Sequence, residues 1–122
     1  MVYDVTYSSD SRILIRTFKG RIRFSDVFES WDYLVRNDKI GPEVIGILND
    51  FIYAELIMNR DNLVQLMSYF QENSEIFERI KLAVVMMSPE SIVLPVIASQ
   101  NYPQFKIEAF STLDAAEKWL RQ

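Results

Sequence analysis

The chain of 122 residues contains no cysteine and no histidine. Without cysteine it has no disulfide bond and no thiol nucleophile, and the lack of both residue types removes the usual zinc ligands. An activated serine nucleophile also depends on an adjacent base, which is most often histidine. We therefore expect no bound metal and no cofactor, and we expect the protein not to be an enzyme.

Glycine and proline are also scarce, with three and four residues, whereas hydrophobic residues make up 49% of the chain. This composition excludes a disordered chain and a fibrous repeat. A chain of this length buries roughly two thirds of the surface that its unfolded form exposes. We expect a single domain that spans residues 1–122 and holds a substantial core.

Charge and hydropathy exclude two classes of partner. The net charge of −4 argues against nucleic acid, because domains that bind its backbone carry a basic excess. The longest strongly apolar runs, Leu82 to Met87 and Ile92 to Ala98, fall far short of the roughly twenty residues that span a bilayer. Because Met1 is followed by a strand pattern and not by a secretory signal, we expect a cytoplasmic protein without a transmembrane segment.

Basic residues gather in one segment near the start of the chain. Twelve consecutive residues there contain no acid and five cations, namely Arg12, Arg16, Lys19, Arg21 and Arg23. One interpretation is a contact for an anion or a phosphate. The favoured interpretation is a solvated strand edge, where Lys and Arg also discourage pairing with other chains.

Alternating strand and helix patterns predict an α/β fold of order ββαβαβαβα, with about four helices. Its sheet is expected to have five strands, mostly parallel, and to begin with an antiparallel hairpin. The expected elements are strands at Val2 to Tyr7 and Arg12 to Phe18, a helix after Ser25, a strand at Val44 to Asp50, a helix near Asn59 to Asn73, a strand at Ile80 to Met87, a helix from Ser88 that Pro95 kinks or interrupts, a strand at Phe105 to Phe110, and a last helix after Ser111.

The passage from Asp50 to the second helix is the first candidate for a functional site. Sites in open α/β sheets lie where strands end and helices begin, yet Phe51 to Met58 holds no Gly, Ser, Thr, His or Cys and is mainly apolar. We expect these residues either to form a loop that is an exposed docking surface, or to extend the strand or tuck under the second and third helices as core, and self-association satisfies both interpretations. The candidate partner-binding residues are Asp50, Tyr53, Glu55, Leu56, Ile57, Met58 and Arg60.

Two further hypotheses concern small molecules. An apolar pocket for a lipid-like ligand is one, although such residues fill cores more often than they hold ligands. Its candidate residues are Trp31, Phe70, Met86, Met87, Ile92 and Val96. The other, which we favour least, is a hydrolase or transferase that uses Asp50 and Glu55, with Arg60 and Asp61 nearby.

Nearly the whole chain resembles a known family. The opening Tyr3 to Tyr7, the strand that ends at Asp50 and the closing helix Leu113 to Leu120 resemble the STAS-type fold of bacterial anti-sigma factor antagonists, and more specifically the small SpoIIAA-like (STAS/SEC14-like) proteins. In the antagonists, the loop after the third strand carries a serine that a partner kinase phosphorylates, close to an aspartate at the strand end. Asp50 matches the aspartate, but the first Ser or Thr after it is Ser68, inside the expected second helix.

The resemblance implies a non-enzymatic regulatory domain that binds an unidentified protein partner or forms a homodimer. Because the serine is missing, it implies a domain without the phosphorylation switch. SEC14-like relatives of this architecture imply the alternative, a carrier of a lipid-like apolar molecule.

Overall fold

The computed structural model describes residues 3–122 and has the predicted order of elements. A short additional helix, α3, follows α2, and the predicted strand residue Val2 lies outside the described range. The elements are β1 (Tyr3–Ser8), β2 (Ile13–Arg23), α1 (Phe24–Arg36), β3 (Gly46–Ile57), α2 (Arg60–Glu72), α3 (Ser74–Phe77), β4 (Lys81–Val85), α4 (Pro89–Asn101), β5 (Lys106–Phe110) and α5 (Leu113–Leu120).

The five strands form one mixed sheet in the order β1-β2-β3-β4-β5. β1 and β2 are antiparallel, and the remaining neighbours are parallel, as predicted. Strand β4 is apolar after its first residue, Lys81, because both of its faces are covered. Leu82 belongs to the larger core cluster, while Ala83 and Val85 belong to a smaller cluster on the opposite face.

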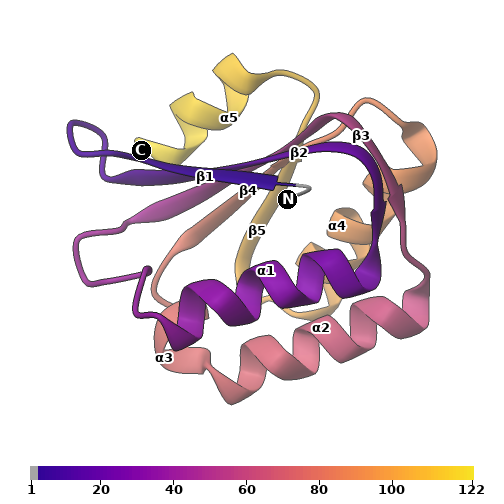
Figure 1. Ribbon diagram of the computed structural model, residues 1–122, viewed down its shortest axis with the longest axis horizontal. Helices are drawn as coiled ribbons and strands as arrows, with labels where there is room; N and C mark the ends of the chain where they lie inside the picture. The colour runs from indigo at the N-terminus through magenta and orange to yellow at the C-terminus, as the bar shows by residue number, and fades with distance from the viewer. Residues whose placement is uncertain (1–2) are drawn as a thin grey trace.

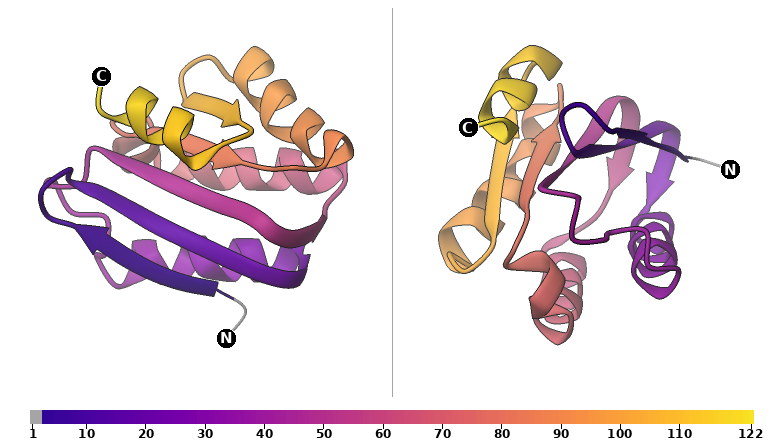
Figure 2. Two further views of the ribbon diagram at one scale, coloured as in Figure 1. Left: turned by 90° about the horizontal axis from the view of Figure 1, so that it is seen from above. Right: turned by 90° about the vertical axis from the view of Figure 1, so that its left-hand side faces the viewer.

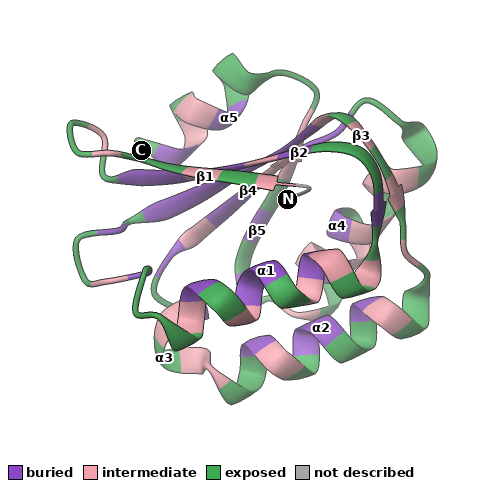
Figure 3. Cartoon of the chain, viewed as in Figure 1, coloured by how far each residue is buried: buried purple, intermediate pink, exposed green. Residues whose placement is uncertain are grey.

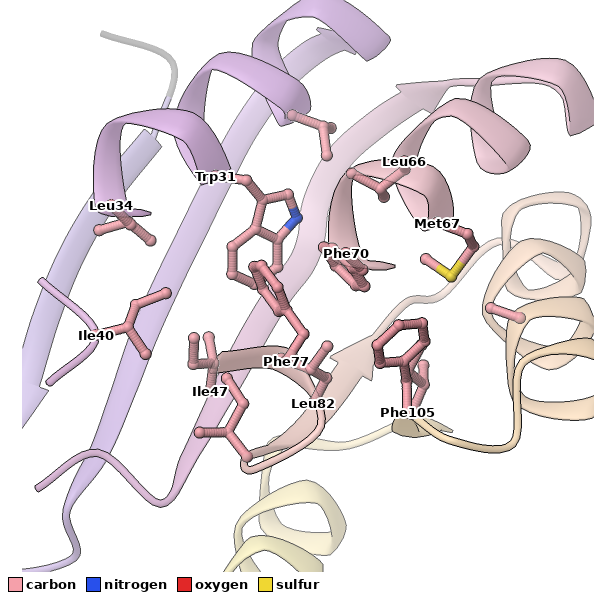
Figure 4. Packing of buried hydrophobic residues seen from close by; sticks show 14 of the residues in the cluster. Trp31, Leu34, Ile40, Ile47, Leu66, Met67, Phe70, Phe77, Leu82 and Phe105 are labelled. Atoms are coloured by element: carbon pink, nitrogen blue, oxygen red, sulfur yellow. The ribbon is translucent and has the colours of Figure 1, made fainter. Parts of the chain in front are cut away.

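The helices cover the two faces of the sheet unequally. Helices α1 to α4 lie on one face, which we call the inner face, and α5 lies alone on the outer face (Figure 1). α5 contacts β3, β4 and β5, so the outer faces of β1 and β2 carry no helix (Figure 2). A cluster of aromatic rings fills the inner core, with Phe70 and Phe77 stacked at 4.0 Å between ring centroids and Trp31 edge-on to both (Figure 4). Such ring pairs contribute about 0.5–1.5 kcal/mol each beyond the area that they bury.

Strands β2 and β3 run on together beyond the rest of the sheet. Within residues 3–122, β1 pairs with β2 as far as Phe18, and β4 pairs with β3 as far as Asp50. The pairing of β2 with β3 continues from Lys19 and Tyr53 to Arg23 and Ile57. We call residues 19–23 and 53–57 the β2–β3 extension, which curls toward the inner helices (Figure 1).

For Phe51 to Met58 the predicted connecting loop is therefore wrong, and the alternative of an extended strand is confirmed. All but Met58 belong to β3, because β2 continues alongside and satisfies backbone groups that a loop would leave to water.

A bulge at the start of this extension reverses the two faces of β3. Thr17 pairs with Asp50 and Lys19 with Tyr53, so β3 contains one more residue than β2 over that interval. The Asp50 carboxylate accepts the backbone N–H of Ile52 at 3.0 Å and so satisfies a donor at the bulge. Before the bulge Phe51 belongs to the inner core, and after it Ala54 and Leu56 do.

Helix α4 is continuous from Pro89 to Asn101, so the predicted interruption at Pro95 is wrong, and the kink that was its alternative stays a prediction. Pro95 has no N–H to donate to the carbonyl of Ser91, which weakens the helix locally. However, Pro95 and Ala98 are buried, and Leu94 and Ile97 pack against the inner core. This packing holds the helix together despite the proline.

Gly46 gives a test of the α5 side of the fold. A Cβ at this position would lie 2.8 Å from Cδ2 of Leu120 and 3.2 Å from the carbonyl oxygen of Lys81. We predict that Gly46→Ala lowers the free energy of unfolding by about 1–3 kcal/mol, because overpacking displaces α5 or β4. Urea denaturation measures this change.

Gly41→Ala is the matched control. A Cβ there meets only the flexible carboxylate of Glu43, so the change is expected to stay within about 0.5 kcal/mol. Equal losses of stability in the two variants would contradict the close approach of α5 to β3.

Candidate functional site

The predicted partner-binding residues separate into three groups in the structure. Tyr53 is 74% exposed and Ile57 38% exposed, and Glu55 between them is also exposed. Leu56 and Met58 are half-buried and pack against the inner core. Asp50 is buried at the bulge, whereas Arg60 is exposed at the first position of α2. The bulge thus places the three exposed β3 residues on the outer face of the extension.

Strand β2 brings three cations to the same outer face. Lys19 pairs with Tyr53, Arg21 with Glu55 and Arg23 with Ile57, and all six residues are exposed (Figure 3). We call this group the basic face, and its members are Lys19, Arg21, Arg23, Tyr53, Glu55 and Ile57. It holds three cations and one carboxylate in a chain with a net charge of −4. Its local potential is therefore opposite in sign to the average of the chain.

The predicted solvated edge is wrong for Arg16. Strand β2 lies between β1 and β3, and Arg16 is only 1% exposed. Even-numbered residues of β2 face the inner core, where Leu14 and Phe18 also lie. The residues of the basic run that remain exposed are Arg12, Lys19, Arg21 and Arg23.

Arg16 is bonded to neutral partners only. Its Nε donates to Oδ1 of Asn49 at 2.8 Å, and its Nη1 donates to Oγ of Ser30 at 2.7 Å. The guanidinium carbon lies 3.6 Å from the centroid of the Trp31 ring, a cation–π arrangement. The ion pairs found within residues 3–122 do not include Arg16.

Burial disfavours the charged form of this side chain. Desolvation lowers the pKa of Arg16 from 12.5 to about 9, and the nearby Tyr3 opposes this effect by favouring the charge. Because about 9 is still above neutral pH, the guanidinium remains protonated there. The inner core thus contains a cation that no carboxylate of the described residues neutralises.

The hydrogen bonds of Arg16 extend across several elements. Asn49 is 2% exposed, and its Nδ2 donates to the carbonyl oxygen of Ala83 at 2.9 Å. The network therefore joins β2 to β3 and β4 through Asn49, and to α1 through Ser30. The network was not predicted from the sequence, although a signal existed. Arg16 lies two residues from Leu14 and from Phe18, which places all three on one face of a strand, and Asn49 interrupts an apolar strand.

A cavity of about 80 Å³ lies beside this network, between the sheet and helices α1, α2 and α4. Within residues 3–122 its lining is apolar except for the side chains of Arg16 and Asn49 and the indole N–H of Trp31. Of the six predicted pocket residues, Trp31, Phe70 and Met86 line it. The other three do not: Met87 is 63% exposed after the end of β4, Val96 is 42% exposed, and Ile92 is half-buried on α4. Whether the cavity holds a ligand stays a prediction.

The carboxylates of the hydrolase hypothesis are not brought together. Asp50 is bonded at the bulge, Glu55 lies on the basic face, and Asp61 is exposed in the first turn of α2. Within residues 3–122 no three His, Cys, Asp or Glu side chains are grouped so as to hold a metal ion. Across the same range, no helix has both the length and the apolar character to cross a membrane.

Comparison with solved structures identifies the fold. The chain is similar to an uncharacterized protein of the DUF3478 family with a SpoIIAA-like fold from Shewanella loihica PV-4, with a TM-score of 0.65 and 16% identity. The match covers 97% of this chain and 91% of that chain. At this identity the likeness shows the fold alone, and it confirms the predicted SpoIIAA-like fold. No protein-family model matches the sequence, and no curated protein matches it.

The Arg16 network predicts strong energetic coupling between its members. We expect Asn49→Leu to lower the free energy of unfolding by about 3 kcal/mol, because it leaves Nε of Arg16 buried without an acceptor. In an Arg16→Met background the same change should cost at least about 1 kcal/mol less, since the unpaired charge is gone. Urea denaturation of the four proteins gives this double-mutant cycle.

Arg21→Met serves as the control for Arg16→Met. Arg21 is exposed on the basic face, so its loss is expected to change stability by less than about 0.5 kcal/mol and to leave the cost of Asn49→Leu unaltered. Additive effects of Arg16→Met and Asn49→Leu would contradict the network.

Proposed function

We propose that the chain is a non-enzymatic, cytoplasmic binding domain of the STAS-like type, which docks a protein partner through the basic face. The observation that carries this proposal is the exposure of an aromatic, an aliphatic and three cationic side chains on one strand pair, with Tyr53 74% exposed. Tyr and Arg are enriched where protein partners bind. An outer face that no helix covers leaves them free for contact.

Charge defines the expected partner. Three cations against one carboxylate suit an acidic surface, and such complementarity speeds association and excludes partners of the wrong sign. A homodimer that places two basic faces against each other would bring like charges together. We therefore favour a different protein over a second copy, and the predicted homodimer stays a prediction.

The proposed mode of action is docking without phosphorylation of the β3 segment. Residues 51–58 offer Tyr53 as their one hydroxyl, and Ser68 lies on α2, outside the extension. The separation of Asp50, Glu55 and Asp61 supports binding over acid–base chemistry.

Ile57→Asp tests this function. The change adds a negative charge at an exposed position of the basic face, so it should reduce capture of the partner from a lysate of the native host by about tenfold or more, at unchanged unfolding free energy. Each captured protein is quantified by mass spectrometry, and light scattering of the purified variant reports self-association. Higher salt should weaken capture by the unaltered chain, because exposed charges are screened.

Val64→Asp is the matched control. Val64 is 52% exposed on α2, away from the outer face, so the same substitution there should leave capture unaltered. Equal capture by Ile57→Asp and by the unaltered chain, with no change of mass in solution, would sink the proposal.

The cavity supports a second candidate function, the binding of a small apolar molecule. Its lining is apolar apart from Arg16, Asn49 and the indole N–H of Trp31. This observation is independent of the basic face, since the two sites lie on opposite faces of the sheet.

A further inference from the structure

We propose that the cavity beside Arg16 binds a small monocarboxylic acid, whose carboxylate pairs with the Arg16 guanidinium and whose short hydrocarbon tail lies against the apolar lining. This inference goes beyond the docking function, which uses other residues. It names a chemical class of ligand for the cavity, and it rests on the charge, the free donors and the size of the site.

The charge of the site is unbalanced. Arg16 is 1% exposed, and both of its hydrogen-bond acceptors, Asn49 and Ser30, are neutral side chains. Taking an ion out of water is costly unless an opposite charge and good hydrogen bonds compensate it. The planar guanidinium matches the geometry of a carboxylate, so a carboxylate supplied from outside is the compensating group that this site lacks.

Two nitrogen donors remain for such a ligand. The hydrogen bonds found within residues 3–122 include none from Nη2 of Arg16 or from Nε1 of Trp31. Yet no fully enclosed side-chain nitrogen or oxygen in that range lacks a partner. Both donors therefore border open space, and since both residues line the cavity, we take that space to be the cavity. Figure 4 shows the indole nitrogen on the side of the Trp31 ring that faces Leu66, another lining residue.

The size and polarity of the cavity limit the ligand. Its volume of about 80 Å³ is roughly half that of an engineered apolar cavity of ~150 Å³ that takes up benzene. Butyrate has as many non-hydrogen atoms as benzene, so the cavity holds its carboxylate and first carbon atoms while the end of the tail extends to the half-buried rim, and a full-length lipid chain does not fit. One guanidinium in an apolar wall balances one negative charge, which disfavours phosphates that carry two.

The entry side is formed by half-buried residues. Leu56, Met58 and Leu94 line the cavity and retain partial exposure, whereas Arg16 and Asn49 do not. The carboxylate thus meets the cation at the buried end, and the tail points toward this rim. Met58 adapts its shape readily, which suits a residue at an entrance.

The full chain labelled with ¹⁵N tests the proposal, because its two tryptophans report separate sites. Trp31 lines the cavity, while Trp119 belongs to α5 and packs on Phe110 on the outer face. Titration with sodium butyrate should shift the indole N–H resonance of Trp31 saturably and leave that of Trp119 in place. Trp119→Phe assigns the two resonances, and sodium chloride at the same ionic strength gives the baseline.

Butyramide tests how much the charge of the ligand contributes to binding, because it has nearly the size and shape of butyrate but is neutral. We expect it to bind at least about tenfold more weakly than butyrate, because it forms no charge-assisted pair with Arg16. Equal affinity for the two compounds, or no shift of the Trp31 resonance with butyrate, would overturn the proposal.

Substitutions complete the test. Arg16→Met should abolish the response to butyrate, whereas Arg21→Met, on the basic face, should retain it, and an unaltered response in Arg16→Met would also overturn the proposal. If Arg16→Met fails to fold, the comparison of butyrate with butyramide on the unaltered chain decides. Ile57→Asp should bind butyrate normally, so failure of the docking function and failure of this site are told apart.

Discussion

Arg16 lies where proteins rarely place a full charge, on the inner face of an internal strand and stacked on Trp31 at 3.6 Å. The structure accommodates it by aligning parts that are distant in the sequence. Ser30 on α1 and Asn49 on β3 must both present an oxygen to the guanidinium, at 2.7 and 2.8 Å. Since Asn49 also bonds to β4, the position of this one cation constrains three strands and a helix. Apolar packing alone tolerates sliding of one layer over another, whereas a buried charge does not.

The bulge at Asp50 is the second constraint, and it determines what each residue of the extension faces. One additional residue in β3 turns Leu56 and Met58 inward and leaves Tyr53, Glu55 and Ile57 outward. The aspartate matches the switch position of the family that the sequence resembles. Here its carboxylate accepts the Ile52 N–H, so we assign it a structural role at the bulge.

The order of the elements was predictable because it depends on local patterns. Apolar residues at helical spacing marked α1, α2 and α5, and Asn59 caps α2 by accepting the N–H of Asn62 at 2.8 Å. The extent of β3 was not predictable in the same way, since it depends on pairing with β2 beyond Phe18. The interruption predicted at Pro95 was wrong for a related reason. The hydrogen bond that a proline removes from a helix can be predicted from the sequence, but the packing of Leu94 and Ala98 on the core cannot.

The same limit applies to the sites. Exposure of Tyr53 and Ile57 follows from the bulge, which a single sequence does not reveal. A basic residue in a segment with five cations and no acid is most simply assigned to the surface. The structure shows instead that Arg16 is buried on an internal strand. Half of the predicted pocket residues line the cavity, because the spacing of apolar residues in the sequence predicts which side of a helix or strand faces the core. The polar end of the cavity is formed by residues 33 positions apart in the chain, a pairing that depends on strand register.

The two sites share a strand. Ile57 belongs to the basic face, while its neighbours Leu56 and Met58 form the rim of the cavity. These three residues are consecutive in the chain, but the side chain of Ile57 lies on the opposite face from those of Leu56 and Met58, so only a displacement of the shared backbone would connect the proposed ligand site with the proposed docking face. If such a displacement coupled the two sites, linkage would require that each ligand change the affinity for the other by the same factor.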